Sequence, residues 1–146
     1  MKISTKGRYG VRIMLDVARH GGEGPVRIAD SALRQAVPPK YAEQITGALV
    51  KGGLLRSIRG ASGGYVLARA PEQYTVGEIL RCMEGNLAPT PCSESNCCDR
   101  ADGCVTHTLW QGLHALTDAY LDGISLKDML NPEFTAPVYR KVEKEK

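Results

Sequence analysis

Apolar residues in the first fifty positions recur at helical spacing and predict three helices. In the segment 5–20, Tyr9, Ile13 and later apolar residues fall four apart, which places them on one face of a helix. The same periodicity predicts a second helix over 28–36 and a third that opens at a pair of prolines and ends near Lys51. These helices each present one apolar stripe to a shared core.

A basic hairpin is expected directly after the third helix. The runs "LLRSIRG" and "YVLARA" read as two short strands, and the glycine-rich "ASGG" between them reads as the turn. Three helices followed by such a hairpin form the outline of a winged helix-turn-helix. The expected fold class is therefore mainly α with a small β-hairpin wing.

The second half predicts a different arrangement of helices and loop. A capping-box pattern opens a helix over 75–84, and the segment 85–103 is too long to be an idle connection. A long helix follows over 104–121 and a short one over 125–130.

The expected organisation has three parts. Residues 1–71 form a winged helix-turn-helix DNA-binding domain, residues 72–130 form a ligand-binding loop with a long helix, and residues 131–146 form a charged tail that we expect to be flexible.

Net charge also differs between the two halves of the chain. Residues 1–70 hold twelve Lys and Arg against four Asp and Glu, a net charge of +8, whereas residues 71–146 carry −5. A basic half attracts phosphate backbones, although a solvated basic surface without a ligand would have the same charge. No apolar run is long enough to span a membrane and no signal peptide opens the sequence. We therefore expect a soluble, cytoplasmic protein.

In a helix-turn-helix the second helix of the pair reads the DNA, and here that is the third predicted helix, which ends near Lys51. Three of its residues are candidates for reading DNA bases. Lys40, Glu43 and Gln44 lie near its start on the side away from the core. Lysine can contact guanine or a phosphate, glutamine can pair with adenine, and glutamate can accept from a cytosine amino group. Facing any other base, Glu43 would be an unpaired anion that opposes binding.

Five further basic residues are candidates for contacts with the DNA backbone and minor groove. An arginine at a wing tip suits a narrow minor groove, and basic residues at the start of the first helix suit phosphates. These residues are Arg56 and Arg59 in the hairpin, and Lys2, Lys6 and Arg8 near the N-terminus.

The stretch "CSESNCCDRADGCVTH" holds four of the five cysteines of the chain. Cys92, Cys98, Cys104 and His107 are separated by five, five and two residues, and the last two share a face at the start of a helix. Three thiolates and an imidazole can bind zinc or iron. Evenly spread thiols on a long loop favour a 2Fe-2S cluster over the close cysteine pairs of structural zinc sites.

Two other classes of protein remain open from the residues alone. An iron-sulfur electron carrier could use the cluster and dock an acidic partner with its basic half, and a zinc-binding adaptor could use the same donors. An enzyme is not expected, because no nucleophile with a base, paired-carboxylate site or phosphate loop is present.

The sequence resembles the IscR-type regulators, a bacterial family of winged-helix transcription factors that includes the NsrR and CymR regulators. The resemblance rests on "STKGRYGVRIMLDVA", "YAEQI", "GLLRSIRGASGGYVLAR", "TVGEIL" and the cysteine-histidine spacing followed by "TLW". It implies a homodimer formed by the long helix, a palindromic DNA operator, and a 2Fe-2S cluster on the four donors, supplied by cluster-assembly proteins. It also implies that the glutamate matching Glu43 discourages one class of DNA site until cluster binding repositions it.

Departures from the family pattern refine these expectations. Lys40 replaces a small polar residue that is more usual there, which leaves the operator sequence open. A nitric-oxide-sensing relative holds a 4Fe-4S cluster with a carboxylate where this chain has Arg8, a cation that cannot bind iron, so the resemblance favours the 2Fe-2S form. Relatives with a shorter cysteine spacing make Cys97 an alternative to Cys98.

The expected function is a repressor of cluster-biogenesis genes, with a redox-sensing or nitric-oxide-sensing regulator as the alternative.

Overall fold

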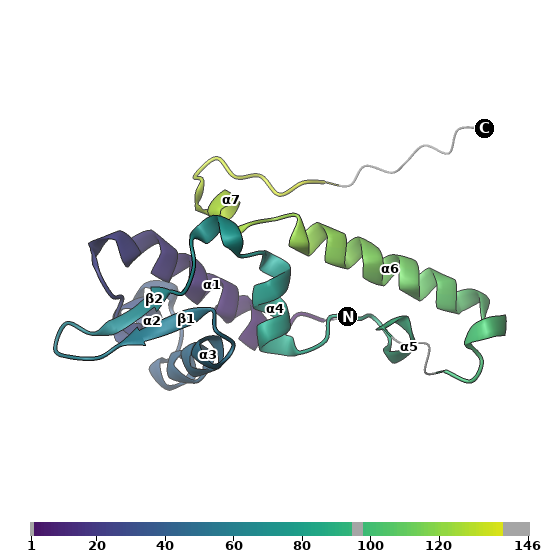
Figure 1. Ribbon diagram of the computed structural model, residues 1–146, viewed down its shortest axis with the longest axis horizontal. Coiled ribbons are helices and arrows are strands. Elements are labelled where there is room, and N and C mark those ends of the chain that lie inside the picture. Colours follow the sequence, from purple (N-terminus) through teal and green to yellow (C-terminus); the bar gives the residue numbers. More distant parts are fainter. Residues whose placement is uncertain (1, 95–97, 139–146) are drawn as a thin grey trace.

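The computed structural model describes residues 2–94 and 98–138 of the chain (Figure 1). The α-helices are α1 (Thr5–His20), α2 (Ile28–Gln35), α3 (Pro39–Lys51), α4 (Val76–Glu84), α5 (Pro91–Glu94), α6 (Val105–Asp122) and α7 (Leu126–Leu130). The strands are β1 (Leu55–Ile58) and β2 (Gly64–Leu67), and short 3-10 turns are η1 (Gly21–Glu23), η2 (Pro71–Gln73) and η3 (Ala101–Gly103).

The predicted fold class is confirmed: a mainly helical chain carries a two-stranded antiparallel hairpin. The first three helices begin and end within two residues of their predicted bounds. The segment 85–103 differs from the expected plain loop, because α5 and η3 form within it. Short turns of this kind satisfy backbone groups that an irregular loop would leave unpaired.

Local signals account for the helix bounds. Ser4 caps α1 by accepting a hydrogen bond from the Gly7 amide, and Pro39 occupies the first turn of α3, where no backbone donor is needed. Ala36 ends α2 in the left-handed conformation, with φ at 50°, so the chain turns sharply into α3 and completes the helix-turn-helix.

The wing is more than a free hairpin. Leu55 pairs with Leu67 and Ile58 with Gly64, and an isolated bridge joins Val26 to Tyr65 on the outer edge. A two-stranded hairpin is marginally stable by itself. The bridge therefore fastens the wing to the segment that leads into α2.

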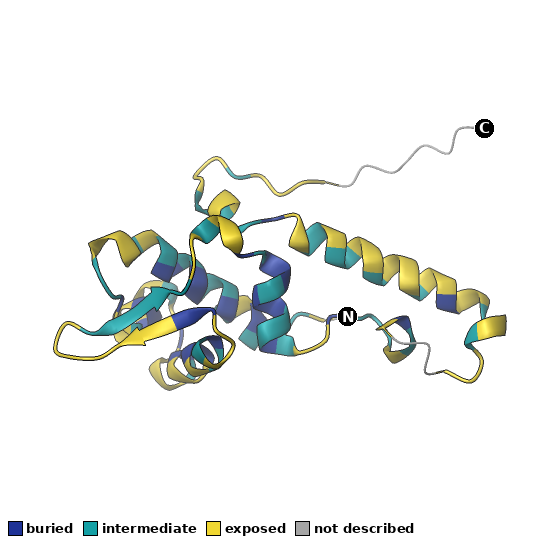
Figure 2. Cartoon of the chain, in the orientation of Figure 1, coloured by how far each residue is buried: buried dark blue, intermediate teal, exposed yellow. Residues whose placement is uncertain are grey.

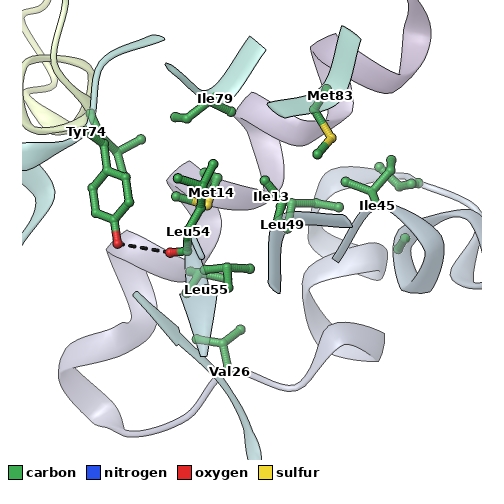
Figure 3. Close-up of a cluster of buried hydrophobic side chains, with 14 of the residues drawn as sticks. Ile13, Met14, Val26, Ile45, Leu49, Leu54, Leu55, Tyr74, Ile79 and Met83 are labelled. Carbon is green, nitrogen blue, oxygen red and sulfur yellow. Dashed lines mark hydrogen bonds between the residues drawn. The ribbon is translucent and has the colours of Figure 1, made fainter. Parts of the chain in front are cut away.

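One core unites the helices and the wing (Figure 3). Ile13 of α1, Ile45 and Leu49 of α3 and Ile79 of α4 are all fully buried. Tyr74 closes this core, and its hydroxyl donates to the Leu54 carbonyl at 2.9 Å. Helix α4 is thus packed as part of the same core as the helix-turn-helix.

Helix α6 extends away from this core and runs beside the segment that contains α5 (Figure 1). A second cluster of buried residues, including Leu80 of α4 and Ile124, holds only its C-terminal end. Figure 2 shows that most of α6 is exposed. Within the described ranges, no helix is long and apolar enough to cross a membrane.

Candidate functional site

Helix α3 presents the three predicted base-reading residues to solvent. Lys40, Glu43 and Gln44 are exposed, while Ala42 and Ile45 on the opposite side are fully buried. Because the buried side packs into the core, the helix cannot rotate to hide its polar side. The arrangement can insert a polar helix face into a major groove.

A buried carboxylate fixes the helix-turn-helix against α1. Asp16 is 1% exposed, and Arg34 of α2 donates to its two oxygens at 3.0 and 2.7 Å. Gln35 adds a hydrogen bond at 3.1 Å. Burial opposes the charged form of Asp16, but the hydrogen bonds from Arg34 and its neighbours outweigh it and hold the pKa of Asp16 below its usual value.

The wing presents Arg56 on β1 and Arg59 in the tip loop, both exposed. Helix α3 and β1 are in contact, so the strand that carries Arg56 lies beside α3, and Arg59 follows in the tip loop. Arg27, which leads into α2, donates to the Ala61 carbonyl of the tip loop at 2.9 Å. Sequence reasoning missed Arg27, because no local spacing links it to a turn thirty-four residues away.

The start of α1 carries the remaining basic candidates. Lys2 and Arg8 are exposed and Lys6 is half-buried, and the Arg8 guanidinium donates to the Thr5 hydroxyl at 3.2 Å. This first turn packs against the end of α4. It therefore lies next to the segment that leads toward the cysteines.

The predicted cluster donors lie at one end of the molecule, on α5, on α6 and between them (Figure 1). Cys92 is on α5 and Cys98 follows it in the connection. Cys104 occupies the N-cap position of α6, and His107 lies in the first turn of that helix. Cys98 is exposed, Cys92 and Cys104 are half-buried, and His107 is buried. Helices α5 and α6 pack against each other, so all these donors belong to one local unit.

The environment of Cys104 favours a thiolate. Its Sγ lies 3.1 Å from the Thr106 hydroxyl, and hydrogen bonds from this hydroxyl and the His107 amide lower the pKa of the Cys104 thiol. A thiolate is the form that binds a metal. The Cys92 Sγ lies 3.4 Å from the Thr90 hydroxyl.

The donor types fit an iron-sulfur centre, but their positions do not form one coordination sphere. In the part of the chain that the structure describes, no three or more His, Cys, Asp or Glu side chains are close enough to hold a metal ion. The connection between α5 and α6 would have to draw the donors together, as is common where metal binding is coupled to folding. The alternative ligand Cys97 lies outside the described residues.

The fifth cysteine belongs to the core. Cys82 of α4 packs its thiol 3.7 Å from the Ala48 carbonyl of α3. Burial raises the pKa of this thiol. Cys82 is half-buried and packs against the core as a small apolar side chain.

Helix α6 carries an apolar stripe, defined as Val105, Leu109, Leu113 and Leu116, with 88, 60, 39 and 48% of each residue exposed. The helix is tied to the body on another side, because Arg81 of α4 pairs with Asp122 at 2.7 Å. The stripe is thus held outward while the opposite side is anchored. Exposed contiguous apolar surface of this kind is typical of a protein-protein interface.

Comparisons with known proteins agree with this architecture. The Rrf2 family, described as an iron-dependent transcriptional regulator, matches residues 3–132. The chain is 42% identical over 130 residues to the HTH-type transcriptional regulator IscR of Aliivibrio salmonicida, covering 89% of this chain and 77% of that protein. It is 39% identical over 131 residues to IscR of Serratia proteamaculans, with 90 and 80% coverage.

Two solved structures share the fold. IscR of T. potens superposes with a TM-score of 0.73 at 42% identity, covering 89% of this chain and 86% of that one. CymR, the global cysteine regulator of B. subtilis, superposes with a TM-score of 0.75 at 37% identity, with 89 and 96% coverage.

Proposed function

Because the chain belongs to the Rrf2 family of transcriptional regulators, we propose that it binds a palindromic operator as a homodimer under the control of a 2Fe-2S cluster. The regulator function is established by the family, which also confirms the expectation that the chain is not an enzyme. The observation that carries the DNA-binding part is the exposed polar face of α3 next to the basic wing.

The proposed DNA contacts divide by role. Lys40, Glu43 and Gln44 read base edges in the major groove, and Arg59 enters the minor groove from the wing. Basic residues that lie outside the groove contact phosphates and set the register. These phosphate contacts come from Lys2, Lys6, Arg8 and Arg56.

A variant pair tests this division. Gln44→Ala should lower affinity for the preferred operator, because each good bidentate base contact contributes about 1–3 kcal/mol of discrimination. Arg56→Ala should weaken binding to all sequences alike and reduce the salt dependence by about one phosphate contact. Arg19→Ala, at the far end of α1 and exposed, is the matched control for loss of a charge. Equal losses on operator and random DNA in Gln44→Ala would remove this residue from base reading.

The proposed ligands of the cluster are Cys92, Cys98, Cys104 and His107. The lowered pKa of Cys104 and the contact of α5 with α6 support this set. When bound, the cluster supplies a redox-active, net negative centre at the start of α6. His107 would bind iron as a neutral imidazole, in place of a fourth thiolate.

Alanine variants decide which of the adjacent cysteines binds. Cys98→Ala should abolish the visible absorption of the anaerobically assembled protein, and Cys97→Ala should leave it intact. The reverse result would transfer the ligand role to Cys97. Metal analysis of the same preparations separates iron and sulfide from zinc, which is the adaptor alternative.

The proposed regulatory circuit follows from these parts. The protein represses cluster-biogenesis genes in the cytoplasm, and cluster-assembly proteins supply its cluster. The apolar stripe of α6 supports a homodimer, which places two recognition helices on the two halves of a palindrome.

One experiment tests the proposal as a whole. Anaerobically purified protein, with and without its cluster, is titrated against the promoter upstream of its own gene and against a random duplex. We expect sequence-selective binding that depends on the cluster and falls steeply with salt. Absence of selective binding would favour the electron-carrier alternative, and equal binding in both forms would remove the cluster from the switch.

A further inference from the structure

Glu84, the last residue of α4, caps a different helix. Its Oε1 atom accepts hydrogen bonds from the Ser4 amide at 3.1 Å, the Ser4 hydroxyl at 2.6 Å and the Gly7 amide at 3.1 Å. These donors are the cap and first turn of α1. One carboxylate oxygen from α4 therefore satisfies several groups at the start of α1, where the helix dipole also favours a negative charge.

This contact is a capping box whose acidic member comes from another element. In the usual motif, the residue three positions after the cap carries the carboxylate that accepts from the cap amide. In α1 that position is Gly7, which has no side chain, and Glu84 supplies the carboxylate from eighty residues away. The start of α1 is thus completed only when α4 is in place.

The contact between the start of α1 and the last turn of α4, called the α1–α4 joint below, is closely packed. A Cβ atom at Gly7 would collide with Oε1 of Glu84, and a Cβ at Gly10 would lie 2.6 Å from the Met83 Cγ. Both glycines therefore let α1 approach the last turn of α4 closely. Packed contacts of this kind transmit displacement instead of absorbing it.

The α1–α4 joint connects the basic start of α1 with the segment that leads to the cysteines. On one side, the capped turn carries Lys6, and Arg8 follows directly. On the other side, Gly85 leaves α4 with φ at 82°, and the chain passes the buried Leu87 before it reaches Cys92. Glu84 lies between the basic start of α1 and the segment that carries the cysteines.

We propose that Glu84 is the positioning residue that couples the state of the cysteine segment to the DNA-facing start of α1, an inference that rests on the proposed function. A change in the segment after Gly85 moves the end of α4, and the capped turn of α1 moves with it. Lys6 and Arg8 then shift relative to the DNA backbone. The coupling needs no contact between the cluster and DNA.

The test compares operator affinity with and without the cluster in wild-type protein and in Glu84→Ala. Coupling between two sites typically changes affinity by about 5- to 150-fold. In Glu84→Ala we expect the two affinities to converge to a ratio of about 1, with iron and sulfide content unchanged. Amide exchange at Gly7 and Arg8 gives a DNA-free readout, because it should differ between the two forms in wild-type protein only.

Two further variants keep the test decisive if Glu84→Ala folds poorly. Glu84→Gln keeps an acceptor oxygen and loses the charge, so we expect an intermediate ratio. Glu78→Gln is the matched control, because it removes a charge from α4 at a residue that pairs with Arg69 and not with α1. It should keep the wild-type ratio.

The outcomes separate this proposal from the proposed function. A wild-type ratio in both Glu84 variants would overturn the coupling role and leave cluster-controlled DNA binding intact. Equal affinities of the two wild-type forms would overturn the coupling itself while DNA binding stands. No selective DNA binding by wild-type protein would overturn the proposed function and this inference with it.

Discussion

Leu109→Gln should weaken the proposed homodimer without unfolding the protomer. Complete burial of a leucine side chain contributes about 1.5–3 kcal/mol, so covering the 60% of Leu109 that is exposed contributes about 1–2 kcal/mol. A two-fold symmetric interface contains this residue twice, so the loss is about 2–4 kcal/mol. That corresponds to a roughly 30- to 700-fold increase in the dimer dissociation constant.

Sedimentation equilibrium over a range of protein concentrations measures this constant directly. Leu33→Gln is the matched control, because Leu33 is 83% exposed on α2 and does not belong to the α6 stripe. We expect that control to dimerise as the wild type does, and circular dichroism should show unchanged helix content in both variants. A Leu109→Gln protein with the wild-type dissociation constant would refute the assignment of the stripe to the dimer interface.

Three further predictions concern the parts that hold the DNA-binding face together. Because the pKa of Asp16 is lowered in the folded protein, its contribution to stability should be present above about pH 4 and lost as the pH falls through the folded value. Urea titrations at a series of pH values should show this loss, and Asp16→Asn should make the unfolding free energy less dependent on pH in the acid range. Tyr74→Phe should lower the unfolding free energy by about 1–3 kcal/mol in urea, since its buried hydroxyl donates to one backbone carbonyl and accepts from one amide; an unchanged midpoint would contradict this. Arg27→Gln should change the unfolding free energy by less than about 0.5 kcal/mol. It should nevertheless speed amide exchange around Ala61, because it removes the hydrogen bond to the wing tip. Exchange as slow as in the wild type would show that the Val26 bridge alone holds the wing.

Local sequence signals were sufficient for the long helices and the hairpin, but they did not show α5 or η3 within the segment 85–103. Helix α1 begins at Thr5 and ends at His20 as its apolar period and the following glycines predict, and α3 begins at Pro39 for the same kind of reason. Periodicity, caps and prolines act within one or two turns of chain, so a single sequence contains them in full. The exposure of Glu43 and Gln44 was predictable too, because the apolar side of the same helix determines which side is left for solvent.

Contacts between distant segments were decided only by the tertiary structure. Nothing in the local pattern shows that Glu84 supplies the carboxylate missing at Gly7, or that Asp16 is held by Arg34. A hydrogen bond between side chains far apart in sequence depends on how the helices pack, and helix periodicity says which side is buried but not which neighbour meets it. The charge of Arg27 was likewise visible, whereas its contact with the wing tip was not.

The cysteine segment divides between these two cases. The sequence by itself determined the donor types and their spacing, because thiols and imidazole have known metal chemistry wherever they lie. The helical pattern also placed Cys104 at the start of α6. Only the structure showed the amide and hydroxyl donors that lower the pKa of Cys104, and it left the described donors apart from one another. Spacing limits which residues can meet, but their meeting depends on the surrounding packing and on the metal that they bind.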